Sequence, residues 1–432
     1  MITRILSPFQ YVPGISRAAA GAAVLAGALA FAPTPAQAQT LAEALIAAYS
    51  NNPTLAARRA RLRATDEQMP QALSNWRPSV AITGSTGKEY NSSTLRAGGF
   101  GGRSQNRTPQ TLGVSVTQPL FRGGRTVAAT EEAEHAVRAE RARLIDTEQD
   151  ILLAAATAYL NVFRDEALLA LNINNEKVLK RQLEATKDRF EVGEITRTDV
   201  HQAEARLAGA TADRIRAEAT LENSRATYEN VVGLPAPRNL ELPGDPGGLP
   251  KDRLDAIKLA ATTNPNVIAA EFDRKAGQKA VREVKGELLP EVDVTASFDR
   301  AFETSSDRGI SNSADIRLNL TVPIYQQGAV YSRLREAKQD LAELTRNIDQ
   351  ARRDAIEDAT SAWENLQTAR ARVVGHTEAQ RDERVAAFEL SAAIGRMTAQ
   401  DLKLAVDVYD PRNHYDEVRG KWIGGSSSEE GK

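Results

Sequence analysis

The side chains best suited to acid–base or metal chemistry are four histidines, His135, His201, His376 and His414. A zinc site or a Cys–His nucleophile needs cysteine or closely spaced histidines. These histidines are widely scattered, and the chain has no cysteine. The many serines and acidic residues form no recognisable catalytic motif. We therefore expect no enzyme, no cofactor and no metal site.

A glycine run, Gly98-Gly99-Phe100-Gly101-Gly102, is the next candidate for chemistry. Such a run can cradle phosphate groups when it follows a strand and opens a helix. Here it lies between two strand-like segments and opens no helix. We interpret it as a flexible hairpin loop.

A third motif, Val192-Gly193-Glu194-Ile195-Thr196, joins two helical stretches. Gly193 suits the left-handed cap that ends a helix, and Thr196 suits the N-cap of the next one. The motif predicts a tight turn between two helices.

The helices that this turn connects are unusually long. The stretch from 125 to 192 has no proline or glycine, so one helix about 100 Å long is predicted there, with a return helix over 197–232. Apolar residues recur at heptad spacing, which an ordinary coiled coil also shows. Small residues allow close helix approach on two faces, as the wall of a tube requires, so a tube is the other interpretation of this pattern. The spaced positions are Val137, Leu144, Ile151 and Ala158, then Leu179, Leu183 and Phe190, and Val200, Ala203, Leu207 and Ala210 on the return helix.

Four segments alternate apolar and polar residues with the period of a strand. They cover about 79–90 and 112–118, then about 291–298 and 316–322. Such strands fit a membrane β-barrel, but a bacterial barrel needs at least about 8 strands. A membrane role therefore requires several chains to share one barrel. Two soluble hairpins are the alternative.

The N-terminus has the pattern of a secretory signal peptide over 1–38. Arg4 and Arg17 precede an apolar run that ends in a small-residue site, Ala36-Gln37-Ala38, so cleavage leaves Gln39 first. Losing two arginines moves the formal net charge from −2 to −4. No basic patch predicts a nucleic-acid partner. Without cysteine no disulfide can form, so stability must come from packing and association.

The chain also contains an internal duplication. Pro78 follows Pro53 by 25 residues, and Pro290 follows Pro265 by the same 25. We therefore expect a first repeat over 39–233, a proline- and glycine-rich linker over 234–250, a second repeat over 251–404 and a tail over 405–432. The paired markers are Asn52-Pro53 with Asn264-Pro265, and Gln118-Pro119-Leu120-Phe121-Arg122-Gly123-Gly124 with Val322-Pro323-Ile324-Tyr325-Gln326-Gln327-Gly328.

These motifs, with the segment 393–402, together resemble the TolC-like outer-membrane efflux family, the outer-membrane factors of tripartite export systems. The resemblance implies a mainly α fold with a β-barrel part. Three chains would give a 12-stranded outer-membrane barrel that contacts lipid and continues as a periplasmic α-helical barrel. It also implies a homotrimer, a periplasmic adaptor and an inner-membrane pump of the resistance-nodulation, ABC or major-facilitator type. The chain would be a passive duct for efflux or type I secretion.

The resemblance also implies roles for residues at the periplasmic tip. Val192, Gly193 and Thr196 match the turn that receives the adaptor, and Asp199 matches an aspartate that helps to close the entrance. Local structure alone explains Asp199 equally well, because a carboxylate in the first turn of a helix is favoured by the helix dipole.

The second helical hairpin, over about 329–394, is short. From the Ala-Tyr pair at 158 to Gly233 is 75 residues, whereas from the Ala-Trp pair at 362 to Gly395 is 33, a difference of 42. Val374, Gly375 and Thr377 are the candidates for a contracted second tip. The arginine, tyrosine and aspartates that narrow the family's entrance have no counterpart here.

Three explanations fit this shortfall: a naturally open duct, a truncated non-gating paralogue, or an artefact of how the sequence was obtained. We predict a leaky conductance without divalent-cation block. The alternative function is a periplasmic coiled-coil structural or adaptor protein, which would partition into the soluble periplasmic fraction.

Overall fold

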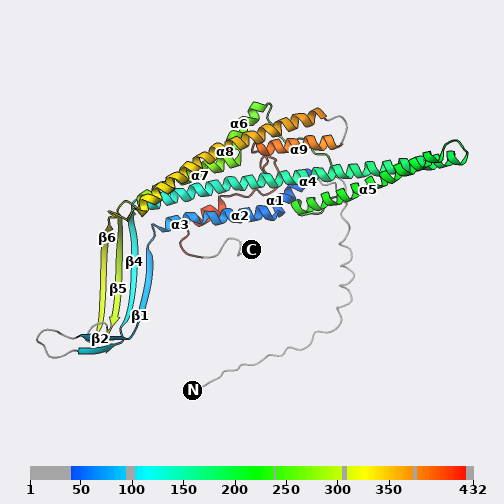
Figure 1. The fold of residues 1–432 in the computed structure, drawn as a ribbon. Helices are drawn as coiled ribbons and strands as arrows, with labels where there is room; N and C mark the ends of the chain where they lie inside the picture. The colour runs from blue at the N-terminus through cyan, green and yellow to red at the C-terminus, as the bar shows by residue number, and fades with distance from the viewer. Residues whose placement is uncertain (1–39, 94–102, 238–239, 304–308, 373–376, 425–432) are drawn as a thin grey trace, which may run out of the picture.

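The computed structural model describes residues 40–93, 103–237, 240–303, 309–372 and 377–424. The signal-peptide residues Ala36, Ala38 and Gln39, and the glycine run at 98–102, lie outside these ranges. Figure 1 shows an elongated molecule with a β-sheet at one end and long helices running away from it. Within the described residues, no helix is both long enough and apolar enough to cross a membrane.

One antiparallel sheet contains four strands in the order β1-β4-β5-β6. The β4–β5 pairing joins the two halves of the chain, with Gln118 opposite Val294. The stretch 79–90, expected as one strand, is divided after Thr86, and its second part pairs separately with β3. The strands are β1 Ser79–Thr86, β2 Glu89–Ser93, β3 Arg103–Arg107, β4 Gln110–Arg122, β5 Glu291–Phe302 and β6 Ile310–Thr321.

The helices of the first half surround one very long helix, α4, of 67 residues. Asn52 is the N-cap of α2 and accepts a hydrogen bond from the N–H of Thr54 at 2.9 Å, while Pro53 fills the first helical position, where no N–H is needed. The helices are α1 Leu41–Asn51, α2 Pro53–Asp66, α3 Gln68–Ser74, α4 Arg125–Glu191 and α5 Arg197–Val232.

The second half begins its long helix with the same local chemistry. Asn264 caps α7 by accepting from the N–H of Asn266 at 2.9 Å, and Pro265 follows it. The helices are α6 Arg253–Thr263, α7 Pro265–Gly286, α8 Ala329–Arg372, α9 Thr377–Ala393 and α10 Asn413–Arg419. Figure 1 shows that α4 and α5 extend well past the ends of α8 and α9.

The main hydrophobic core lies where α1, α4, α5 and α9 meet. Tyr159 and Tyr228 are its largest fully buried side chains. The Tyr159 hydroxyl donates to the Glu241 carbonyl at 2.9 Å and accepts from the Glu241 N–H at 3.1 Å, which holds the segment after α5 against the core. The segment after α9 also packs there, and the N–H of Tyr409 donates to the Tyr49 hydroxyl at 3.0 Å.

The sheet meets the helices at a junction where two backbones touch. Gly123 has φ +61° and Gly124 has φ +76°, so both lie in the left-handed region that favours glycine. A Cβ at Gly123 would overlap the carbonyl oxygen of Gly286 at the end of α7. A Cβ at Gly124 would meet nothing within 4 Å.

We expect Gly123→Ala to destabilise the chain more than Gly124→Ala, although the backbone conformation is similar. Gly124→Ala should lower the free energy of unfolding by about 1–2 kcal/mol through backbone strain alone. Gly123→Ala adds a steric overlap and should cost about 3 kcal/mol or more. Thermal unfolding of the two detergent-solubilised variants, followed by circular dichroism, measures the difference. Equal effects would contradict the close contact with Gly286.

Candidate functional site

The four-stranded sheet has one apolar face and one polar face. Directly paired residues point to the same face of a sheet. Ile82 pairs with Val114, which pairs in turn with Phe298, and Val294 pairs with Leu318. Most of these apolar side chains are exposed, with Ile82 at 73%. A broad exposed apolar face of this kind marks contact with a membrane or a partner.

The opposite face carries hydroxyl, amide and charged side chains. The Asn319 amide donates to Asp293 at 2.8 Å and to the Thr295 hydroxyl at 3.2 Å. The Ser297 hydroxyl donates to Asp315 at 2.8 Å. This face is therefore suited to water. Strands β1 and β6 form the two edges, so the sheet of a single chain is open.

The four residues expected at the first tip lie together at the turn between α4 and α5. Gly193 has φ +79°, and Val192 is 76% exposed. Thr196 and Asp199 form a capping box, in which Asp199 accepts from the Thr196 N–H at 2.9 Å and from its hydroxyl at 2.7 Å. These two hydrogen bonds lower the pKa of Asp199. Asp199 thus has a structural task whether or not a partner docks there.

The candidates for a second tip are only partly described. Val374 and Gly375 lie outside the described residues. Thr377 is the first residue of α9, and α8 ends at Arg372. The two helices of the second hairpin are therefore described up to Arg372 and from Thr377 onward.

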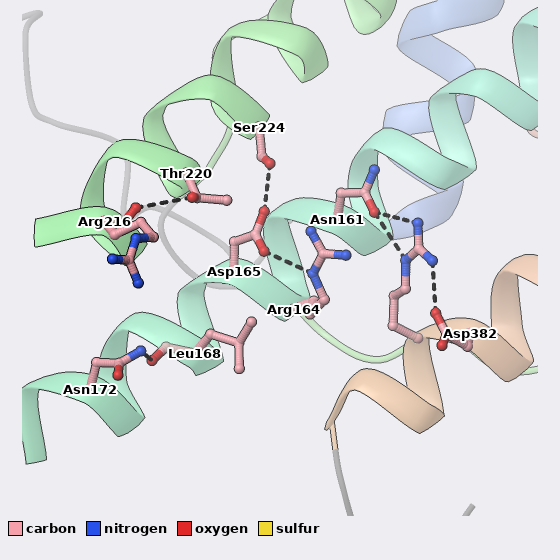
Figure 2. Close-up of polar contacts among 10 residues, drawn as sticks. Asn161, Arg164, Asp165, Leu168, Asn172, Arg216, Thr220, Ser224 and Asp382 are labelled. Carbon is pink, nitrogen blue, oxygen red and sulfur yellow. Dashed lines mark hydrogen bonds and ion pairs between the residues drawn. The ribbon is translucent and has the colours of Figure 1, made fainter. Parts of the chain in front are cut away.

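At this level α9 is attached to α4 through polar contacts (Figure 2). The Arg381 guanidinium on α9 donates to the Asn161 side-chain oxygen on α4 from Nε at 3.0 Å and from Nη2 at 2.6 Å. Arg381 also pairs with Asp382 at 2.7 Å. These bonds fix the outer part of the short hairpin to the long helix.

One helical turn further along α4, a buried carboxylate attaches α5. Asp165 is 2% exposed, accepts from the Ser224 hydroxyl on α5 at 2.5 Å, and pairs with the Arg164 Nε at 2.8 Å. Burial of a carboxylate requires such partners. We name Asn161, Arg164, Asp165, Ser224 and Arg381 the hairpin junction (Figure 2).

The hairpin junction was not anticipated from the sequence, yet the sequence holds a signal for it. Asp165 continues the heptad series of Ile151 and Ala158, both of which are buried. A charged residue at the next position of an apolar heptad series indicates a buried polar contact.

Nearer the sheet, two acidic side chains face each other between α4 and α7. Glu132 hydrogen-bonds Glu283, and burial, together with the charge of Glu283, raises the pKa of Glu132 to about 7. Adjacent Glu131 behaves oppositely, because its hydrogen bond with Lys279 lowers its pKa. Near neutral pH, Glu132 is therefore protonated in part of the molecules, and in that form it can hydrogen-bond Glu283.

Comparison with known proteins gives a consistent result. Residues 44–234 and 256–400 match the family described as Outer membrane efflux protein. The outer membrane efflux protein BepC of Brucella suis is 32% identical over 446 residues, covering 93% of this chain and 95% of BepC. That aligned length exceeds the 432 residues of this chain, so BepC has residues that this chain lacks.

More distantly related outer-membrane proteins also match this chain over most of its length. The outer membrane protein TolC of Escherichia coli is 23% identical over 404 residues, covering 90% of this chain and 80% of TolC. The crystal structure of the Campylobacter jejuni CmeC outer membrane channel superposes with a TM-score of 0.62 at 15% identity, covering 96% of this chain and 98% of CmeC. This last likeness concerns the fold.

We expect Asp165→Ala to cost about 3 kcal/mol of unfolding free energy, because it leaves the Arg164 guanidinium half-buried without its carboxylate. Asp382→Ala is the control, since the Asp382 side chain is 53% exposed and should cost less than about 1 kcal/mol. Denaturant unfolding followed by circular dichroism measures both. Similar losses of unfolding free energy in the two variants would show that the buried Asp165 stabilises the chain no more than the exposed Asp382.

We also expect stability to depend on pH through Glu132. Its pKa in the folded chain, about 7, lies above the ordinary 4.5, so its contribution is fully present below about pH 4.5 and is lost as pH rises towards 7. Glu132→Gln should flatten this dependence, which can reach about 3 kcal/mol. Glu131→Gln is the control and should leave the change in stability between pH 4.5 and pH 7 unaltered. An equal slope in Glu132→Gln and the unsubstituted chain would refute the assignment.

Proposed function

The chain belongs to the outer membrane efflux protein family, and from this premise we propose that three copies assemble into one duct. The chain is an outer-membrane channel for efflux or type I secretion, with a periplasmic extension. In the proposed trimer, three four-stranded sheets close a 12-stranded barrel in the outer membrane. The helices of the three chains continue it as a periplasmic tube.

The observation that carries the trimer is the open, two-faced sheet. Its apolar face suits lipid, and its polar face suits a water-filled lumen. The backbone groups on the outer edges of β1 and β6 would be unsatisfied in hydrocarbon. Four strands are fewer than a barrel can close with. Pairing β1 of one copy with β6 of the next satisfies both edges and closes the barrel at 12 strands.

The duct itself performs no chemistry in this proposal, and no cofactor is required. Export energy comes from an inner-membrane pump, to which a periplasmic adaptor connects the duct. Val192, Gly193, Thr196 and Asp199 form the tip that faces the adaptor. The capping box keeps the start of α5 intact at this exposed end.

The proposed chain organisation follows the duplication. Residues 1–38 are removed as a signal peptide, 39–233 and 251–404 are the two repeats, 234–250 connects them, and 405–432 is a tail. The matching Asn-Pro caps of α2 and α7 support the duplication. The short second hairpin, with Val374, Gly375 and Thr377 at its contracted tip, leaves the periplasmic mouth incompletely sealed.

We expect the chain in outer-membrane fractions as a heat-modifiable trimer that requires detergent for release. In planar bilayers it should conduct continuously, without block by divalent cations, because the second hairpin lacks the length to narrow the mouth. Single-channel recording measures this directly. A tightly closed channel that divalent cations block would contradict the open mouth while leaving the duct intact.

Two variants of β6 test the membrane barrel. Ile316→Lys places a charge on the apolar face, which costs about 2–4 kcal/mol at the membrane midplane, so trimer yield should fall. Ser313→Lys places the same charge on the polar face and should be tolerated, since Ser313 pairs with Asp299. A monomer released without detergent would contradict the duct and favour a periplasmic coiled-coil protein.

A further inference from the structure

The helices of the second half are interrupted where α9 ends and α7 begins. The Thr263 hydroxyl donates to the Ile394 carbonyl at 2.7 Å, and the Asn264 amide donates to the Ala393 carbonyl at 3.4 Å. Gly395, with φ +79°, lets the two backbones approach, because a Cβ there would overlap the Thr263 carbonyl oxygen. Both helices pack against α4 and α8, so α9 and α7 follow one another between these two long helices (Figure 1).

A cleft of about 380 Å³ opens at this break. Side chains from α4, α7, α8 and α9 line it, and carboxylates from three of these helices dominate the lining. The last residues of α9 also lie there, and the carbonyl end of a helix carries a partial negative charge. We name the carboxylates and two polar residues of this lining the acidic cleft. Its members are Asp146, Gln149, Asp150, Asp358, Ser361 and Glu389.

The negative charge of the acidic cleft is not balanced by the chain itself. Within the part of the chain that the structure describes, none of the four carboxylates forms an ion pair. Two arginines act on them from a distance, but each already pairs with a different carboxylate. Arg58 pairs with Glu140 at 3.4 Å, and Arg381 pairs with Asp382 at 2.7 Å. The acidic cleft therefore has a surplus of negative charge.

This surplus also affects the acidity of the carboxyl groups. Burial raises the pKa of Asp146, and the charge of Asp150 raises it further. Burial likewise raises the pKa of Asp150, Asp358 and Glu389. A bound cation favours the charged form of such groups. The cleft is thus an environment that a positively charged ligand would stabilise.

A buried amide in the wall of the cleft points to a ligand independently of the carboxylates. Gln149 lies on α4 between Asp146 and Asp150, lines the cleft and is 4% exposed. Its Nε2 has no hydrogen-bond partner among the described residues. Nearly all buried amide N–H groups in proteins have an acceptor. An oxygen atom of a ligand in the cleft would provide one.

A single metal ion does not fit this arrangement. Packed helices lie about 8–10 Å apart, so α4 and α8, with α7 and α9 between them, are separated by about twice that distance. Ligands of calcium or magnesium must lie within about 2.0–2.6 Å of the ion. Among the described residues, no three histidine, cysteine or acidic side chains are placed so that they could hold a metal ion together. A matching ligand carries its positive charges at separate places.

We propose that the acidic cleft binds an organic oligocation of the amino-sugar class, with several ammonium groups and several hydroxyl groups. Ammonium groups lie against Asp146 and Asp150 on one side and against Asp358 and Glu389 on the other. One hydroxyl oxygen accepts from Nε2 of Gln149. The volume of the cleft is in the range of small-molecule sites, about 300–1,000 Å³. All lining residues belong to one chain, so binding does not require the trimer proposed above.

Titration calorimetry on the detergent-solubilised full chain, at neutral pH and low salt, tests the charge. The probe is kanamycin, an amino sugar with ammonium and hydroxyl groups. Removing two carboxylates together, by Asp150→Asn with Asp358→Asn, should weaken binding by about tenfold or more. The matched control is Asp340→Asn with Glu343→Gln, which removes two exposed carboxylates of α8 outside the cleft and should leave the affinity unchanged.

The role of Gln149 is tested by comparing two probes. Spermidine has ammonium groups but no oxygen atom. Gln149→Leu should weaken kanamycin binding by about fivefold and leave spermidine binding unchanged, because only kanamycin offers an acceptor to the amide. Asp150 and Asp358 are exposed, so the double asparagine variant still decides the question if Gln149→Leu does not fold.

The place of binding is tested with single cysteines, since the chain has none of its own. Ser361→Cys lies in the acidic cleft, and Ser332→Cys is an exposed control on the same helix. Kanamycin at about ten times its dissociation constant should slow maleimide alkylation of Ser361→Cys about tenfold. It should not change the alkylation of Ser332→Cys.

Four results would overturn the inference. They are no binding of kanamycin, an equal loss of affinity in the double variant and its control, equal protection of the two cysteines, and displacement of kanamycin by an equal concentration of Mg²⁺. The last result would assign the cleft to a metal ion. Binding is measured on the solubilised chain, so a failure of trimer assembly or of conductance tests the duct function separately.

Discussion

The backbone of a sheet edge must find hydrogen-bond partners, and in hydrocarbon no water can supply them. This requirement governs the rest of the molecule. Four strands with an apolar face and two open edges cannot be stable in lipid as a single chain, so the proposed association follows from the sheet rather than from any particular contact residue. The antiparallel order β1-β4-β5-β6 also places the two halves of the chain side by side through the β4–β5 pair. The helices that leave these strands must then run next to each other, which sets the geometry of the periplasmic part.

Much of this organisation was predictable from sequence because it depends on local chemistry. The Asn-Pro pairs at 52 and 264 specify helix starts, since asparagine caps the N-terminus and proline needs no N–H there. The uninterrupted stretch after Arg125 predicted one helix, and α4 covers it to Glu191. Gly193 and Thr196 marked the turn, which has the expected left-handed glycine and N-cap. The resemblance to the outer-membrane efflux family, and with it the function and location, is confirmed by the family match.

The features that could not be predicted from the sequence depend on contacts between segments that lie far apart in the chain. Nothing in the stretch 79–90 shows that the strand ends at Thr86 and that the next residues pair with β3. The raised pKa of Glu132 needs Glu283 from another helix, and the role of Asp165 needs Ser224 from α5.

The composition of the main core has a consequence for how the protein is made. Leu41 from α1 and Met397 and Ala399 from the far end of the second half are buried in one cluster, and Tyr409 bonds Tyr49 across it. The core is therefore incomplete until almost the whole chain has been delivered. Contacts of such large sequence separation form slowly, and exposed apolar surface promotes aggregation in the meantime. The apolar sheet face adds to this exposure, so a newly exported copy depends on protection in the periplasm until both its core and its barrel are closed.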